Sequence, residues 1–145
     1  MFKAIHVNLA ILFILSSAVG TLAQRIDDRG HRAVGYIDSS GNVQDASRRI
    51  IGRIRSSGRI EDGRFQTIGY LTDQGRVQDR SRKTLGFIDG RTGKVTNAMG
   101  LPLGYIDSKG RVQDRMRSTI GYSRNVKIEH VALFFFFFFF FHAGS

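Results

Sequence analysis

A unit of about 17 residues repeats along most of this chain of 145 residues, and the repeat limits the folds that the chain can adopt. Residues 35–45 (GYIDSSGNVQD) return almost unchanged as residues 104–114 (GYIDSKGRVQD). The leading glycines are Gly35, Gly52, Gly69, Gly86, Gly104 and Gly121, so the spacing is 17 residues except for one step of 18. This regularity predicts that each copy forms the same small structural unit.

Each copy is typical of a β-hairpin. The β-branched Ile37 and Val43 flank residues 38–42, whose polar side chains and late glycine suit a type I turn closed by a glycine at positive φ. Such a turn pairs Ile37 with Val43, and both then project from one face. A cross-strand apolar pair contributes roughly 0.2–1 kcal/mol, too little to hold one hairpin, so stacked copies must supply the core. The matching pairs are Ile54/Ile60, Leu71/Val77, Ile88/Val95 and Ile106/Val112.

A second apolar position comes directly before each leading glycine. In an extended strand it alternates with the first, so we expect these side chains on the opposite face of the hairpin. The glycine itself shares a face with Ile37, and a side chain there would crowd the place where strands converge. The residues of this second column are Val34, Ile51, Ile68, Leu85, Leu103 and Ile120.

The two ends of the repeat region are complementary halves of one unit. Residues 26–32 match the second half of a repeat, and residues 120–122 match the first half. The N-terminal half can pair with the C-terminal half, whereas an open solenoid would need distinctive caps that are not visible. We therefore predict an all-β fold: a ring of about five tandem hairpins over residues 24–133, closed by its own termini.

The repeat resembles that of the bacterial five-fold beta-flower proteins, a family associated with Bacteroidota. The resemblance is carried by residues 104–115 (GYIDSKGRVQDR), by the other copies and by the phenylalanine run near the C-terminus. It implies an exported ring of hairpins and transfers no catalytic residues. Residues 99–102 depart from the pattern.

The first 23 residues are expected to be a signal peptide. Lys3 supplies a positive charge, an apolar stretch follows, and residues 21–23 end in the small Ala23 that signal peptidase requires. The stretch over residues 7–19 is short for a transmembrane helix. We expect the chain to be exported, with a periplasmic, cell-envelope or extracellular location.

Charge and cysteine usage narrow the classes of partner. Without Lys3 the chain carries 21 lysines and arginines against 12 acids, a formal net charge of +9, and it contains no cysteine. Such an excess is typical of proteins that bind nucleic acid, a membrane surface or polyanionic glycans, and export makes nucleic acid the least expected of the three. No two histidines have the spacing of metal ligands, so we expect neither a metal nor a cofactor.

Two polar positions recur at the end of each hairpin. A ring of carboxylates at Asp45, Asp62, Asp79 and Asp114 could serve calcium or acid–base chemistry, but we favour aspartates that accept hydrogen bonds from the following turn, because Asn97 replaces one of them. The arginines after them either grip a sulfated or phosphorylated glycan or form a solvated edge that discourages strand aggregation. We favour the edge. These arginines are Arg80, Arg82, Arg115 and Arg117.

An aromatic residue follows most of the leading glycines, with Arg53 as the exception. A circle of aromatic faces could bind sugars, although packing between hairpins is the commoner role of such a column. These candidates are Tyr36, Tyr70, Phe87, Tyr105 and Tyr122.

Eight consecutive phenylalanines at residues 134–141 open a C-terminal segment over residues 134–145. We favour an extended strand, buried on both faces, that threads the ring or covers one mouth. The alternatives are docking to a membrane or a partner, and a homopolymer whose length hardly matters to the fold. A soluble monomer would not expose all eight.

No set of residues suggests catalysis, because the histidines are isolated and no nucleophile motif is present. The sequence therefore predicts a non-enzymatic structural or interaction protein of the cell envelope. The alternatives are a carbohydrate-binding module that uses the repeated tyrosines or arginines, and a membrane-associated protein anchored by the phenylalanine run.

Overall fold

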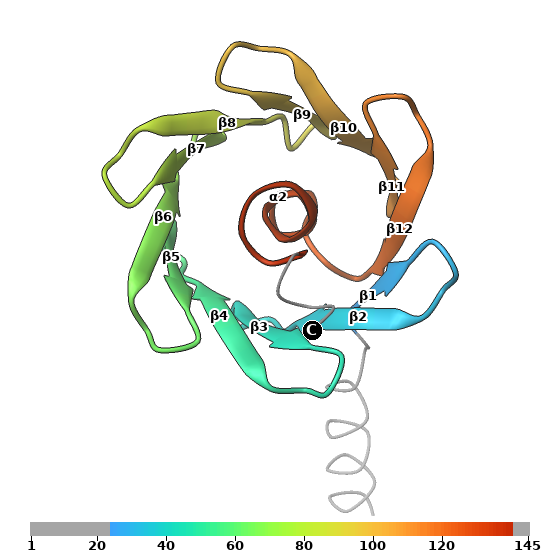
Figure 1. The fold of residues 1–145 in the computed structure, drawn as a ribbon, viewed down its shortest axis with the longest axis horizontal. Helices are drawn as coiled ribbons and strands as arrows, with labels where there is room; N and C mark the ends of the chain where they lie inside the picture. The colour runs from blue at the N-terminus through green and yellow to red at the C-terminus, as the bar shows by residue number, and fades with distance from the viewer. Residues whose placement is uncertain (1–23, 141–145) are drawn as a thin grey trace, which may run out of the picture.

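The computed structural model describes residues 24–140, and these form a closed ring of twelve antiparallel strands around a central helical segment (Figure 1). The strands follow one another around the ring in chain order. Their bounds are β1 Arg25–Asp28, β2 Ala33–Ile37, β3 Asn42–Asp45, β4 Ile50–Ile54, β5 Arg59–Asp62, β6 Thr67–Leu71, β7 Arg76–Asp79, β8 Thr84–Ile88, β9 Lys94–Asn97, β10 Pro102–Ile106, β11 Arg111–Asp114 and β12 Thr119–Arg124.

The ring is closed as predicted, by pairing of its two terminal half-repeats. Strand β1 lies antiparallel to β12, with Ile26 opposite Ser123 and Asp28 opposite Gly121. The other five hairpins are contiguous in sequence, and Ile37 is paired with Val43 as expected. Because every strand has two neighbours, the described ring has no free sheet edge.

The predicted glycine turns also join neighbouring hairpins. Gly41 has a φ of +83°, and its carbonyl accepts a hydrogen bond of 2.8 Å from the Ile54 amide of the next hairpin. A Cβ on Gly41 would lie 2.0 Å from the Ile54 carbonyl oxygen, so only glycine fits. The same amide-to-glycine bond recurs at Gly58, Gly75, Gly93 and Gly110.

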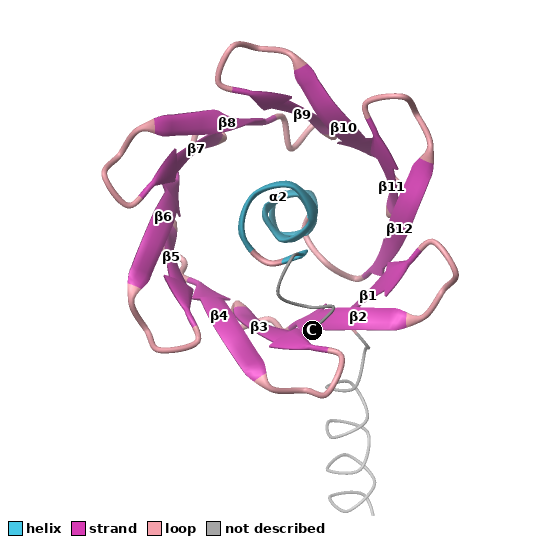
Figure 2. Ribbon diagram, viewed as in Figure 1, coloured by secondary structure: helices cyan, strands magenta, loops and turns pink. Residues whose placement is uncertain are grey.

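The ring has two different mouths. The hairpin mouth is formed by the turns within hairpins, at residues 38–41, 55–58, 72–75, 89–93 and 107–110. The connector mouth is formed by the turns between hairpins, which we call connectors, at residues 28–32, 45–49, 62–66, 79–83, 97–101 and 114–118. Figure 2 shows these loops between the strands of the ring.

The second apolar column occupies a β-bulge in every repeat, which corrects its predicted position. Val43 is opposite Gly52 while Gln44 is opposite Ile50, so Ile51 is an extra residue on its strand. A bulge re-aims the side chain it contains. Ile51 and its five counterparts are therefore partly buried against the central core and do not form a separate opposite face.

The phenylalanine run is helical, so the prediction of an extended strand is wrong. The chain leaves β12 at the hairpin mouth, forms α2 (Ile128–Ala132) and continues as the π-helix η1 (Leu133–Phe138) inside the ring. Figure 1 shows this segment as a coil at the centre of the strands. The run does fill the ring, as expected. It is helical because the closed ring offers no free strand edge for an extended segment to pair with, whereas a helix forms its own backbone hydrogen bonds.

Six successive phenylalanines meet the six leading glycines, one for each hairpin. Added Cβ atoms on these glycines would lie 2.4–3.0 Å from the phenylalanine rings, so the absent side chains make room for the rings. Each step along the run moves one hairpin back around the ring. The matched pairs are Phe134 with Gly35, Phe135 with Gly121, Phe136 with Gly104, Phe137 with Gly86, Phe138 with Gly69 and Phe139 with Gly52.

Burial of the run removes the interpretation that it anchors the protein in a membrane. Phe134 is completely buried, Phe139 is 2% exposed, and only Phe140 is classed as exposed among the described phenylalanines of the run. Phe141 lies outside the described residues, as does the predicted signal peptide over residues 1–23. Within residues 24–140, no helix has the length and apolar character needed to cross a bilayer.

Candidate functional site

The predicted aromatic column lies on the outside of the ring, where connector residues cover it. Tyr36 alternates with the core-facing Gly35 and Ile37, so its side chain points outward. The guanidinium carbon of Arg48 lies 3.5 Å from the centre of the Tyr36 ring. The same contact joins Tyr70 to Arg82 at 3.9 Å and Tyr105 to Arg117 at 3.6 Å.

Three repeats vary this contact. In one repeat the two residue types are exchanged: Arg53 stands at the strand position and Phe65 at the connector position, with 5.3 Å between the guanidinium carbon and the ring centre. Tyr122 stacks on His31 across the ring closure, at 4.2 Å between ring centres. Phe87 is more exposed and has the guanidinium of Arg76 from the adjacent strand at 5.9 Å.

The connector residue that covers each aromatic side chain has a strained backbone conformation. Arg48, Arg82 and Arg117 have φ values of 68°, 67° and 66°, which residues other than glycine rarely adopt. His31 and Phe65 share this conformation, whereas Gly100 takes the position in the fifth connector. That glycine explains why Phe87 has no connector partner.

The candidate arginines therefore divide into two groups. All four are exposed, but Arg82 and Arg117 lie over tyrosine rings, whereas Arg80 and Arg115 make no such contact within the described residues. The tyrosines lie on different strands around the ring, so the structure gathers the candidates into separate pairs and not into one cavity. One face of each of Tyr36, Tyr70 and Tyr105 is covered by a guanidinium group, which leaves less of each ring for a sugar to stack on.

The repeated aspartates hold the connectors, as predicted. Asp45 accepts hydrogen bonds from the backbone N–H groups of Ser47 (2.9 Å) and Arg49 (3.0 Å). In the first connector the backbone N–H of Arg32 donates the equivalent hydrogen bond to Asp28. This bond is the main reason that the pKa of Asp28 is below its ordinary value. The same pair of backbone bonds is accepted by Asp28, Asp62, Asp79, Asn97 and Asp114.

The two mouths differ in charge. The six connectors hold ten lysines and arginines against five aspartates, a formal excess of five positive charges. Over the equivalent positions, residues 38–42, 55–59, 72–76, 89–94 and 107–111, the five hairpin turns hold seven cations against four acids, a formal excess of three positive charges. The connector aspartates accept backbone amide hydrogen bonds, whereas Arg80, Lys83 and Arg115 are exposed. Among the described residues, Arg29, Arg64, Arg80, Lys83 and Arg115 take part in none of the ion pairs.

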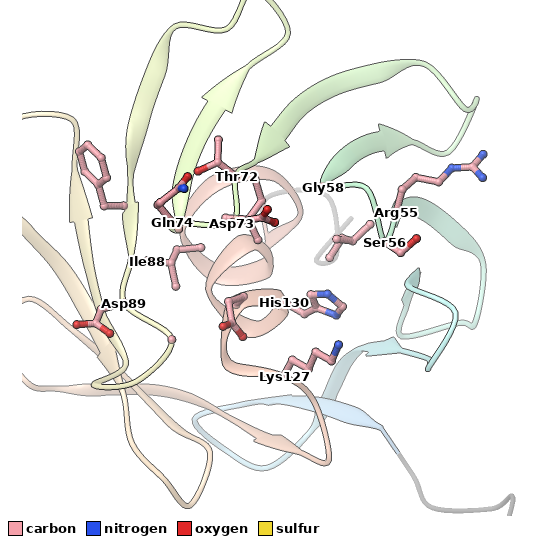
Figure 3. Close-up of a pocket in the computed structure, with 16 residues that line it drawn as sticks. Arg55, Ser56, Gly58, Thr72, Asp73, Gln74, Ile88, Asp89, Lys127 and His130 are labelled. Atoms are coloured by element: carbon pink, nitrogen blue, oxygen red, sulfur yellow. The ribbon is translucent and has the colours of Figure 1, made fainter.

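A groove of about 630 Å³ opens at the hairpin mouth, between three hairpin turns and the start of α2 (Figure 3). Lys127 and His130 extend from the helical segment into this space, and Ser56 and Asp73 come from two of the turns. Burial, aided by the charge of Lys127, lowers the pKa of His130, so this imidazole is neutral near pH 7. The lining mixes both charges without a nucleophile–base pair, and no three metal-ligating side chains cluster within the part of the chain that the structure describes.

A second groove, of about 710 Å³, opens at the connector mouth beside the end of the phenylalanine run. Its apolar lining includes Ile50, Ile51 and Phe139, and its polar lining includes Arg49 and Arg64. Asp45 and Asp62 line it as well, so the groove combines apolar side chains with charges of both signs.

Sequence reasoning missed two features of this outer surface. The exchange of Arg53 and Phe65 was available from their 12-residue spacing, which equals that of Tyr36 and Arg48. The apolar content of the connector mouth gave a weaker signal, because Met99 and Met116 share a repeat position in only two of the six connectors.

Comparison with known families matches residues 23–139 to the family described as 5-fold beta-flower protein. The chain belongs to this family. The match includes all six leading glycines and the phenylalanines that contact them, so the beta-flower resemblance of the sequence is confirmed. No curated protein and no solved structure matches this beta-flower chain.

Proposed function

We propose that this beta-flower chain is an exported, non-enzymatic binding protein of the cell envelope, which uses its connector mouth to hold a polyanionic partner. One observation supports the proposal most directly, namely the difference in charge between the two mouths. Over equivalent positions, the connectors carry an excess of five positive charges and the hairpin turns an excess of three.

The structure of the connectors favours binding through several exposed cations. Arg80 and Arg115 are exposed, whereas the neighbouring Arg82 and Arg117 are held against tyrosine rings. The closed sheet and the filled centre keep the connectors in fixed positions, so little conformational entropy is lost when a rigid mouth meets an extended anion. Export is supported by the signal-peptide pattern of residues 1–23.

The test measures binding of the purified protein to a soluble sulfated polysaccharide. We expect binding that weakens steeply at about 1 M salt, where the screening length is about 3 Å. The variant Arg80→Gln/Lys83→Gln/Arg115→Gln should lose affinity by tenfold or more, since each cation near an anionic surface contributes on the order of 1 kcal/mol.

The matched control removes three charges from the other side. The variant Arg91→Gln/Lys94→Gln/Lys109→Gln has the same net charge, but its changes lie in or beside the hairpin turns. It should keep the affinity of the native chain. Equal losses in the two variants would show that net charge alone drives binding and would refute a specific role of the connector mouth.

A further inference from the structure

Exposed apolar side chains collect at the same mouth as the larger excess of positive charge. The large hydrophobic residues classed as exposed within residues 24–140 are Ile50, Phe65, Phe87, Met99, Leu101, Met116 and Phe140. All of them except Phe87 lie in a connector, directly after one, or at the end of the phenylalanine run. Met99 is 85% exposed and Met116 is 76% exposed, although each belongs to a tightly hydrogen-bonded turn.

Two adjacent connectors carry three of the exposed apolar residues, and basic connectors flank them. The adjacent connectors 97–101 and 114–118 carry Met99, Leu101 and Met116. The connector 79–83 before them carries three cations, and the connector 28–32 after them carries two. A ligand that satisfies only the cations would leave the methionines in water.

The groove beside the phenylalanine run repeats this combination on a smaller scale. Its apolar lining includes Ile50, Ile51, Phe138 and Phe139. Its charged lining is Arg49 and Arg64 together with Asp45 and Asp62, and Arg49 is paired with Asp45 at 3.1 Å. An amphiphile with an anionic head and an apolar tail can use this lining, because the head can meet Arg64, which is in none of the ion pairs of the described residues, while the tail covers the exposed Ile50.

We infer that the connector mouth docks onto the surface of an anionic lipid bilayer. This inference rests on the proposed function, since it names the polyanion as a layer of acidic lipid headgroups. The cations of the connectors meet the headgroups, and Met99, Leu101 and Met116 enter the interface between headgroups and acyl chains. Charge attraction and apolar burial act together in this mode of binding, and neither needs a membrane-spanning segment.

The first experiment uses co-sedimentation of the purified protein with vesicles of phosphatidylglycerol mixed with phosphatidylcholine. The native chain should bind these vesicles and should bind vesicles of phosphatidylcholine alone at least tenfold more weakly. The variant Met99→Gln/Leu101→Gln/Met116→Gln keeps every charge and should lose tenfold to a hundredfold in affinity for the mixed vesicles, on the order expected for withdrawing three side chains from apolar contact.

Two controls separate this inference from the proposed function. The variant Met99→Leu/Met116→Leu keeps apolar side chains and should bind the vesicles like the native chain. The glutamine variant should still bind the soluble sulfated polysaccharide as the native chain does. If it also binds the mixed vesicles normally, the lipid inference is wrong while polyanion binding stands. If the native chain binds neither probe, both fail.

A second measurement tests the orientation, because the chain contains no tryptophan. A tryptophan introduced by Met116→Trp should show a blue-shifted emission when mixed vesicles are added. One introduced by Ser57→Trp, in a hairpin turn at the other mouth, should show none. A shift at Ser57→Trp without a shift at Met116→Trp would overturn the assignment of the docking face.

Discussion

The Arg53 guanidinium covers the ring of Phe65, which reverses the order of partners found in Tyr36 and Arg48. The exchange shows that the contact between a cation and an aromatic ring is retained even when the residues that make it trade places. The outer surface of the ring is thus organised by a pairwise interaction and not by a column of one residue type.

We predict from this relationship that Phe65→Arg alone destabilises the protein, because it places two guanidinium groups against each other. The double variant Arg53→Tyr/Phe65→Arg restores the arrangement of the other repeats and should recover about 0.5–1 kcal/mol relative to Phe65→Arg, the scale of an exposed cation–π contact. Urea unfolding of the two variants and the native chain measures the difference. No recovery in the double variant would contradict the pairwise interpretation.

The leading glycines should tolerate no side chain. A Cβ on Gly104 would lie 2.3 Å from the carbonyl oxygen of Gln113 and 2.4 Å from the ring of Phe136, so Gly104→Ala should cost about 3 kcal/mol or more. Gly30→Ala is the control, since its nearest contact is a side-chain oxygen of Asp28 at 3.3 Å, and it should cost less than about 1 kcal/mol. Thermal and urea unfolding provide the comparison, and equal losses would sink the steric explanation.

The length of the phenylalanine run should matter only below six residues. Removing one or two of the eight leaves phenylalanine at positions 134–139, where each ring faces its glycine, so stability should change little. Removing three brings His142 into the place of the buried Phe139 and should cost about 3–5 kcal/mol. A series of deletions, followed by urea unfolding, should therefore show a step. An even loss with each deletion would contradict the one-ring-per-hairpin arrangement.

Aspartates in the connectors and in the hairpin turns should make the ring sensitive to acid. The pKa values of Asp28 and Asp89 are lowered, mainly by hydrogen bonds from the backbone amides of Arg32 and Thr92. A carboxyl with a lowered pKa in the folded state contributes stability above its ordinary value of 3.8, and that contribution is lost as the pH falls through the folded-state pKa. The urea midpoint should therefore be level near neutral pH and fall below about pH 4.

A matched variant separates this effect from general acid unfolding. Asp28→Asn keeps an acceptor for the amides and cannot titrate, as Asn97 shows in its own connector. Its urea midpoint should fall less steeply below about pH 4 than that of the native chain. Identical slopes would exclude Asp28 as a source of the acid sensitivity.

Much of the ring could be predicted from the sequence because the repeat encodes it locally. The pairing of Ile37 with Val43 follows from one turn, and ring closure follows from the complementary ends. The bulge at Ile51 could not be predicted, since alternation along a strand assumes one residue opposite one residue.

The phenylalanine run shows a second limit of sequence reasoning. Eight identical residues have no periodicity, so the sequence could not distinguish strand from helix. The choice depends on the six glycines, which lie in six hairpins of the ring and create the space that the rings fill. The connector mouth is similar, because the exposure of Met99 and Met116 depends on how the connectors fold around the ring.

The matching of phenylalanines to glycines also removes the rotational symmetry that the repeats would otherwise have. Strand registers recur from hairpin to hairpin, but a helix advances along its axis as it turns, so no two hairpins meet it at the same level. Phe134, Phe135 and Phe139 are buried while the three between them are only partly buried. Near-identical repeats therefore become six inequivalent positions. The same substitution should change the stability of the protein by a different amount in each of them.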